Sequence, residues 1–183
     1  MGRTIISMEK ANEAIEYLEQ SLNLARLMVN EGKDTPKYWG NLYTLSAISD
    51  NKKDYASAYT YNEELLPILK KFYEEDAETW KAIYVEKLVS RSFYANLLGK
   101  FKEGEQYSLE ALKVDSTHHI AYTNLAAALL LQGKIEEAEI IYRQYKNEFK
   151  DGMLDDFAEF ERLGIIPKDQ EADVERIKAM LKE

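Results

Sequence analysis

Residues 121–145 read AYTNLAAALLLQGKIEEAEIIYRQY, and this stretch decides the fold. Apolar residues recur three and four positions apart on both sides of Gly133, which is the spacing of two amphipathic helices joined by a turn. Small side chains at Ala126 and Ala138 allow the two helices to approach closely, and large side chains fill the space around that contact. The large residues are Tyr122, Leu125, Leu129 and Tyr142. The stretch therefore predicts an antiparallel helical hairpin.

The same pattern repeats along the chain. Gly99 lies 34 residues before Gly133, and residues 85–118 form a weaker copy of residues 119–152. The copy departs from the pattern at Arg91, where a large apolar residue is expected. It keeps Leu88, Ser92, Phe101, Gly104 and Ala111. A fixed period of this kind is the signature of a repeat architecture.

Two earlier segments have the composition of second helices from further hairpins. They are ANEAIEYLEQSL at residues 11–22 and DYASAYTYNEELL at residues 54–66. The small residues that align across the four hairpins are Ala14, Ala58, Gly104 and Ala138, with spacings of 44, 46 and 34. The first two hairpins are therefore expected to have longer helices, by about five or six residues or roughly 8 Å.

This order of small and large residues resembles the tetratricopeptide repeat. The resemblance is closest over residues 119–152, weaker over 85–118 and 39–72, and partial over the opening helix. It covers about residues 8–150 and implies an all-α fold, a right-handed α-solenoid of antiparallel helical hairpins. The structural alternative is an irregular helical bundle whose spacing is accidental.

We expect a repeat domain over residues 1–150 and C-terminal capping helices over 151–183. The repeat domain would hold a partial repeat at 8–30 and units at about 36–74, 76–116 and 117–149. A solenoid needs end caps because its last repeat would otherwise expose an apolar face. The predicted cap residues are Met153, Leu154, Phe157, Phe160, Leu163, Val174, Ile177 and Leu181. The alternative to a capping role for the last helix is that it folds back into the concave groove of the solenoid, where it would act as a displaceable internal ligand.

Local signals place the individual helices. They are expected at about 8–30, 36–50, 54–74, 76–98, 102–114, 117–133, 135–149, 151–163 and 170–182. Ser7, Thr35 and either Asp115 or Ser116 are the predicted caps, and Gly32 is expected just past the first helix. Pro67 predicts a kink or a break, with a functional hinge as the less favoured interpretation.

Composition narrows the classes of partner. The chain has 183 residues, a formal charge of −9 and a pI of about 4.9, which disfavours nucleic acid and anionic membranes. There are no cysteines, which excludes disulfides and thiolate metal sites. No apolar run reaches membrane-spanning length, and residues 1–10 lack the apolar core of a signal peptide. We expect no membrane insertion and favour the cytoplasm, with a removed upstream leader left open.

Few residues suggest chemistry. His118 and His119 are the only histidines, and without a third ligand at suitable spacing we interpret them as surface residues rather than a metal site. Acidic clusters at 136–139 and at Asp155 and Asp156 fall in predicted first turns, where negative charge complements the helix dipole. We expect no enzyme activity, no cofactor and no metal.

The resemblance also implies a binding surface, because the first helix of each tetratricopeptide hairpin lines a concave groove. The implied groove residues are Tyr43, Thr44, Ala47 and Asp50, then Glu86, Val89, Ser90, Phe93 and Asn96, then Ile120, Thr123, Asn124, Ala127 and Leu130. For each of them, packing against the next repeat is the alternative role.

The implied groove is aromatic and apolar, with a few amide and hydroxyl groups. Only Asn96 and Asn124 match the clamp that chaperone-binding relatives use for C-terminal carboxylates, and no basic residue accompanies them. A protein or peptide segment with apolar anchors is the expected partner. The second hypothesis is a structural or oligomerising segment of a larger protein, with no ligand of its own, for which a homodimer is one form.

Overall fold

The structure is a computed structural model that describes residues 2–30 and 36–183, and the side chains of residues 13, 15–30 and 37–183. Every regular element in those residues is helical, as predicted. The chain divides into two compact units, Met1–Lys71 (unit 1) and Phe72–Glu183 (unit 2). The sequence predicted no division at this point, which lies inside helix α3.

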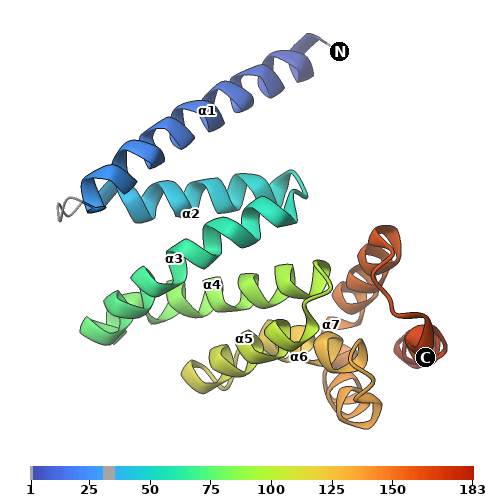
Figure 1. Cartoon of the computed structure of the whole chain (residues 1–183). Coiled ribbons are helices and arrows are strands. Elements are labelled where there is room, and N and C mark those ends of the chain that lie inside the picture. The colour runs from blue at the N-terminus through green and yellow to red at the C-terminus, as the bar shows by residue number, and fades with distance from the viewer. Residues whose placement is uncertain (1, 31–35) are drawn as a thin grey trace. The chain divides into compact units, whose positions relative to one another are not determined.

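Unit 1 consists of α1 (Gly2–Asn30), α2 (Pro36–Asn51) and most of α3 (Tyr55–Glu75). Figure 1 shows α1 beside α2, and Leu22 of α1 and Leu42 of α2 are buried in the core of this unit. Glu64 of α3 joins the three helices. It accepts a hydrogen bond of 2.8 Å from Nε of Arg26 in α1 and another from the hydroxyl of Tyr38 in α2. The bond from Arg26 is the main reason that the pKa of Glu64 is lowered.

Three local predictions for unit 1 can be judged. Helix α2 begins at Pro36, which agrees with the expected range of 36–50 and with the tolerance of proline at the first helical position. Ser7 is not a cap, because α1 begins at Gly2 and includes it. The break at Pro67 is also wrong, because α3 continues through this residue. Gly32 and Thr35 lie outside the described residues.

Unit 2 contains α4 (Ala77–Leu97), α5 (Phe101–Val114), α6 (His119–Leu130), α7 (Ile135–Leu163), the 3-10 helix η1 (Lys168–Gln170) and α8 (Glu171–Lys182). Asp76 caps α4 with a 3.1 Å hydrogen bond from the Thr79 amide. Gly99 and Gly133 follow α4 and α6 with φ of 72° and 80°, a left-handed conformation that favours glycine. The two glycines of the repeat therefore mark two helix ends, as the sequence predicted.

Two predicted features of unit 2 are wrong. Neither Asp115 nor Ser116 caps α6, since His118 is the N-cap residue and makes no side-chain capping bond. The carboxylate of Asp115 instead accepts hydrogen bonds from the backbone amide and the hydroxyl of Thr117, at 3.1 and 2.7 Å. Asp155 and Asp156 lie within α7 rather than in a first helical turn.

Helices α4 and α5 cross at Gly104. A Cβ added there would lie 1.9 Å from Oδ1 of Asn96 and 3.3 Å from the backbone oxygen of Ser92. Beside this contact, the buried Ser92 hydroxyl lies 2.8 Å from the Gly104 carbonyl oxygen and 2.6 Å from the Ser108 hydroxyl. The small residues aligned with Gly104, Ala58 of α3 and Ala138 of α7, are fully buried. The prediction of small residues at close helix contacts is confirmed for Gly104.

Arg91, the residue that departs from the repeat pattern, is buried in unit 2. Its side chain is 1% exposed, and its guanidinium carbon lies 5.4 Å from the centre of the Tyr107 ring. A terminal nitrogen lies 4.0 Å from a carboxylate oxygen of Glu103. The charge therefore faces a ring and a carboxylate of α5, which offset part of the cost of its removal from water.

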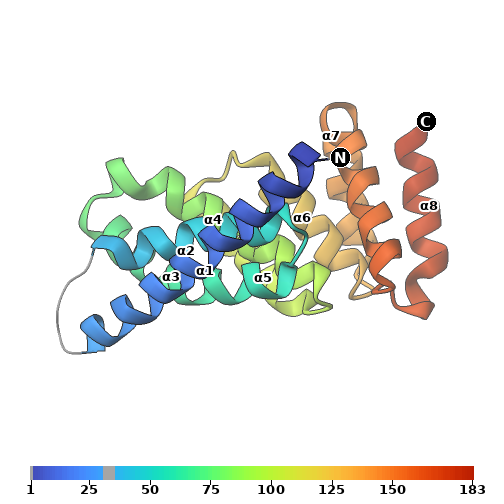
Figure 2. The same ribbon diagram turned by 90° about the horizontal axis from the view of Figure 1, so that it is seen from above.

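Helix α7 reverses direction along its length. The ring centres of Tyr142 and Phe157 are 5.6 Å apart, whereas 15 residues of straight helix would separate their Cα atoms by about 22 Å. Figure 2 shows the chain turning back within α7. The sequence predicted separate helices at 135–149 and 151–163. The two directions are present, although helical residues follow one another from Ile135 to Leu163 without a gap.

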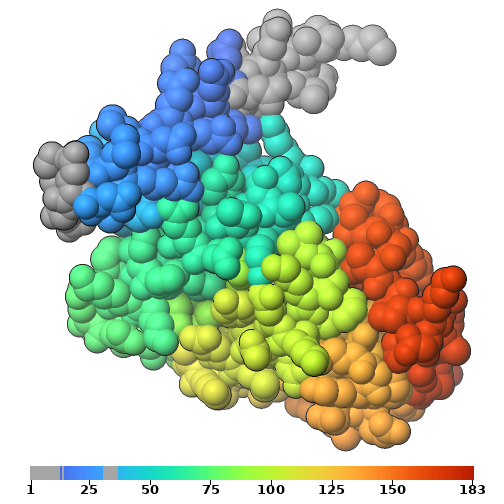
Figure 3. Space-filling model, viewed as in Figure 1, coloured from blue at the N-terminus to red at the C-terminus, as the bar shows by residue number. Residues whose placement is uncertain are grey.

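Helix α8 packs on α7, and most of the apolar residues predicted for the capping helices are buried. Figure 3 shows the atoms of α7 and α8 closely packed on the face in view. The buried residues are Met153, Phe157, Phe160, Val174, Ile177, Met180 and Leu181, whereas Leu154 and Leu163 are half-buried. The main contacts of α8 are with α7 and η1, and they give no support to a last helix folded onto α4 or α6.

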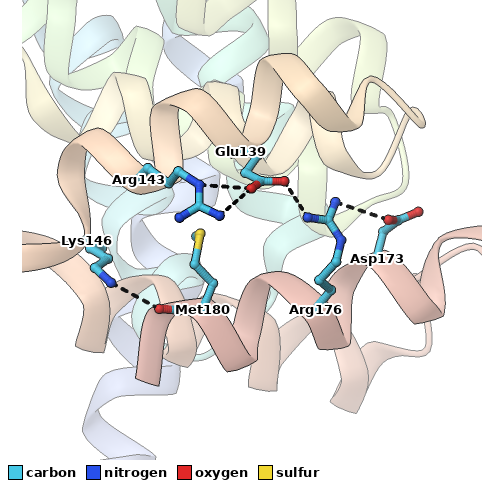
Figure 4. A network of polar contacts seen from close by, with 6 residues as sticks. All are labelled: Glu139, Arg143, Lys146, Asp173, Arg176 and Met180. Carbon is cyan, nitrogen blue, oxygen red and sulfur yellow. Dashed lines mark hydrogen bonds and ion pairs between the residues drawn. The ribbon is translucent and has the colours of Figure 1, made fainter. Parts of the chain in front are cut away.

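Polar contacts join the first part of α7 to α8 (Figure 4). The carboxylate of Glu139 accepts hydrogen bonds from Arg143 of the same helix, at 2.9 Å, and from Arg176 of α8. Seven residues further along α7, Nζ of Lys146 lies 3.3 Å from the backbone oxygen of Met180. Because both pairs run in the same order along the two helices, the first part of α7 is parallel to α8.

Candidate functional site

The candidate site in unit 2 is built on α4 and α6, the first helices of its two hairpins. Two buried asparagines join them: Nδ2 of Asn96 donates to the backbone oxygen of Asn124 at 2.9 Å, and Nδ2 of Asn124 donates to the backbone oxygen of Val89 at 3.0 Å. Both side chains are nearly inaccessible, at 0% and 2% exposed. These are the amides that the sequence offered to a peptide carboxylate, and in this structure they bond to helix backbone instead.

Most of the groove residues predicted on α4 and α6 are buried. They are Val89, Asn96, Thr123, Asn124, Ala127 and Leu130. As the helices stand, these side chains offer a ligand almost no surface. Packing between helices, the alternative role given to them above, accounts for their small or apolar side chains.

Four of the predicted residues remain accessible, and we call them the α4–α6 surface: Glu86, Ser90, Phe93 and Ile120. Glu86 is exposed, Ser90 and Phe93 are half-exposed, and Ile120 is 53% exposed. The Ser90 hydroxyl bonds to the Glu86 carbonyl of its own helix at 3.0 Å. The surface thus combines an aromatic ring and a branched aliphatic side chain with one carboxylate.

A shallow hollow borders Ile120 at the start of α6, and the sequence did not predict it. Its lining is Asp115, Thr117, His118, His119, Ile120 and Phe149. The His119 ring stacks on Phe149 at 5.2 Å, and Tyr122 stacks on Tyr145 at 5.1 Å. The sequence feature that could have indicated this hollow is the group of aromatic residues near the end of the repeat, such as Tyr145. Their spacing alone does not show which of them are accessible.

His118 and His119 lie at the start of α6, as its N-cap and its first residue. Among the residues whose side chains the structure describes, no three histidine, aspartate or glutamate side chains are grouped closely enough to hold a metal ion. Asp115 is the acidic neighbour of His118, and its pKa is lowered chiefly by the hydrogen bonds from Thr117. This carboxylate therefore stays ionised at neutral pH and gives the hollow a negative edge.

The groove residues predicted on α2 belong to unit 1. Thr44 is exposed, with its hydroxyl 2.9 Å from the Gly40 carbonyl oxygen. Tyr43, Ala47 and Asp50 are half-buried. The chemistry of this row matches that of the α4–α6 surface in having one aromatic ring and one carboxylate.

Charge is distributed unevenly between the units. Residues 72–183 contain 23 acidic and 15 basic residues, so they carry nearly all of the net charge of −9. Unit 2 therefore attracts basic partners and repels acidic ones at moderate salt. Among the described residues, none of the helices combines the length and apolar composition needed to cross a membrane.

Comparison with known protein families found no match to the chain, and comparison with curated proteins found no significant match.

Proposed function

We propose that this chain is a protein-binding scaffold of the tetratricopeptide type, a short solenoid of helical hairpins that recognises a segment of another protein. The observation that carries the proposal is the α4–α6 surface. There, an accessible ring and an aliphatic side chain lie on two helices held together by buried asparagine bonds. Rigid helices that present apolar side chains are suited to hold a peptide without a cost of reorganisation.

The partner that fits this surface has apolar anchors flanked by basic residues. Phe93 and Ile120 offer apolar contact area, and the hollow beside Ile120 can receive part of a side chain. Glu86 of the α4–α6 surface already pairs with Lys87, so the attraction for cations comes from Asp115, which lines the hollow beside Ile120, and from the excess of acidic residues in unit 2. An amphipathic helix or an extended segment with such a sequence satisfies both features.

Affinity capture from native lysate, read by mass spectrometry, tests this function. The wild-type chain should enrich a partner that the Phe93→Ala and Ile120→Ser variants enrich several-fold less. Ile140→Ser is the matched control, because Ile140 is 66% exposed on α7 and lies outside the α4–α6 surface. Equal capture by all four proteins would contradict the assignment of the surface.

The second candidate is a structural or oligomerising role with no separate ligand. Exposed apolar residues on α1 favour it, because Tyr17, Leu24 and Leu27 are each more than half exposed. Self-association through α1 can coexist with binding at the α4–α6 surface, since α1 belongs to unit 1 and that surface to unit 2, whereas the absence of any separate ligand excludes the first candidate. Capture of a different protein supports the first, and association of the chain with itself supports the second.

A further inference from the structure

Helix α1 has apolar side chains on two opposite faces. On its inner face, toward α2, Leu22 and Ala25 are only 1% and 4% exposed. On its outer face, Tyr17, Leu24 and Leu27 are 70%, 61% and 62% exposed. A helix that is apolar on both faces is typical of one covered on both sides. The main contacts of α1 are with α2, which lies along one side of it in Figure 1.

The outer residues have the spacing of a coiled-coil seam. Tyr17 and Leu24 are seven residues apart, and Leu27 follows three residues later, so they occupy successive a, a and d positions of a heptad. Gln20 occupies the intervening d position and is exposed. A seam of this kind packs against another helix rather than against a flat surface.

The seam is complementary to itself when two copies of α1 run antiparallel. With the two-fold axis at the level of Leu22, Tyr17 of one copy faces Leu27 of the other, and Gln20 faces Leu24. Each of the four seam positions therefore has a partner, and the two halves of the contact are identical. That is the requirement for a closed two-fold dimer.

Charge favours the same direction. Glu13, Glu16 and Glu19 lie in the first half of the described part of α1, whereas residues 20–30 contain no acidic residue. An antiparallel pair brings each acidic half against a half without acidic residues. A parallel pair would place the glutamates of one copy beside those of the other, which is repulsive.

We propose that the outer face of α1 is a dimer interface, at which a second copy of this chain packs antiparallel through Tyr17, Gln20, Leu24 and Leu27. Four seam positions per copy cover less area than a standard interface, so the dimer is weak, with a dissociation constant in the micromolar range or above. This inference is independent of the binding function proposed for unit 2.

Sedimentation equilibrium of the full chain tests the dimer. The weight-average mass of the wild type should rise from 21.2 kDa toward twice that value as concentration increases to several hundred micromolar. Leu24→Lys and Tyr17→Lys should remain at the monomer mass. Ile140→Lys, which changes an equally exposed residue of α7, should associate like the wild type. Circular dichroism melting shows whether each variant is folded.

Two outcomes would overturn the proposal. One is a wild-type chain that stays monomeric at every concentration, which would mean that α1 is covered by something other than a second copy. The other is a folded Leu24→Lys variant that associates as strongly as the wild type, since the interface would then lie elsewhere.

Cross-linking tests the antiparallel direction, and the absence of cysteine from the chain makes single-cysteine variants unambiguous. Asn23 flanks the two-fold axis, so Asn23→Cys should be joined to its counterpart by a short bismaleimide. Leu27→Cys should not, because the two copies of this residue are about 15 Å apart along the helix axis. The reverse pattern, or equal cross-linking of both variants, would overturn the antiparallel arrangement.

Discussion

Gly104 and Asn96 lie so close together that no side chain fits between them, since a Cβ on Gly104 would be 1.9 Å from Oδ1 of Asn96. The amide of the same asparagine donates to the backbone of α6 at 2.9 Å. One residue of α4 thus fills the contact with α5 and bonds to α6. The arrangement of the α4–α6 surface depends on Asn96, because its side chain contacts both α5 and α6 and so holds these helices in place against α4.

Gly104→Ala should destabilise the chain by about 1–3 kcal/mol, because the added methyl group displaces Asn96 from a packed site. Alanine has a higher helix propensity than glycine, by about 1 kcal/mol, so the variant is destabilised only if the cost of overpacking exceeds that gain. Urea unfolding followed by circular dichroism measures the difference. Gly40→Ala is the control, because its added Cβ meets no atom within 4 Å, and this variant should be equally stable or slightly more stable. A stabilised Gly104→Ala variant would show that the crossing is looser than described.

Asn124→Ala should cost about 1–3 kcal/mol. It removes the 3.0 Å hydrogen bond to the Val89 carbonyl and leaves space between α4 and α6. Ser90→Ala is the control, because Ser90 occupies the equivalent position of α4, 34 residues earlier. Its hydroxyl bonds within its own helix, so the free energy of unfolding should change by less than about 0.5 kcal/mol. The midpoints of urea unfolding compare the two variants. Similar midpoints for both would contradict a structural role for the Asn124 amide.

Asp156 should make stability depend on pH near neutrality. Burial raises its pKa from 3.8 to about 7, and the neighbouring Asp155 adds to the rise. The folded chain therefore holds a proton that the unfolded chain has lost, so stability decreases as pH rises from about 4 to 7. Between pH 5 and 8 the decrease attributable to this group is at most about 3 kcal/mol.

Asp156→Asn should remove this dependence and should be more stable than the wild type at pH 8. Thermal unfolding at several values between pH 5 and 8 compares the two proteins. More acidic conditions are avoided, because the pKa of Glu64 is lowered and protonation of its carboxylate removes stability there. Parallel pH profiles for wild type and variant would mean that Asp156 is ionised in the folded chain throughout this range.

Much of the helical architecture follows from local signals in the sequence. Asp76, Gly99 and Gly133 act within one or two helical turns of their own position, so the ends of α4 and α6 could be placed to within a few residues. Asp115 misled the prediction because its carboxylate can bond to a turn as well as to a helix end. Pro67 did not interrupt α3, since the rest of the helix offsets the loss of one backbone donor.

The candidate site was less predictable, because accessibility depends on contacts between distant residues. Their positions in the repeat predicted that Asn124 and Ile120 both line the groove, yet Asn124 is 2% exposed and Ile120 is 53% exposed. The polar character of asparagine suggested a binding role, whereas a backbone oxygen 35 residues away accepts its hydrogen bond. The stacking of Phe149 on His119 likewise depends on how α7 lies against the start of α6. No spacing in the sequence indicates that contact.

Site-directed photo-cross-linking tests the proposed binding surface most directly. A photoreactive phenylalanine analogue is introduced at Phe93 in one protein and at Ile140 in another, and each is irradiated in native lysate. If the partner binds the α4–α6 surface, position 93 forms a covalent adduct with the same captured partner and position 140 forms none. An adduct from position 140 without one from position 93 would contradict this binding surface, because the partner would then contact α7 rather than the α4–α6 surface.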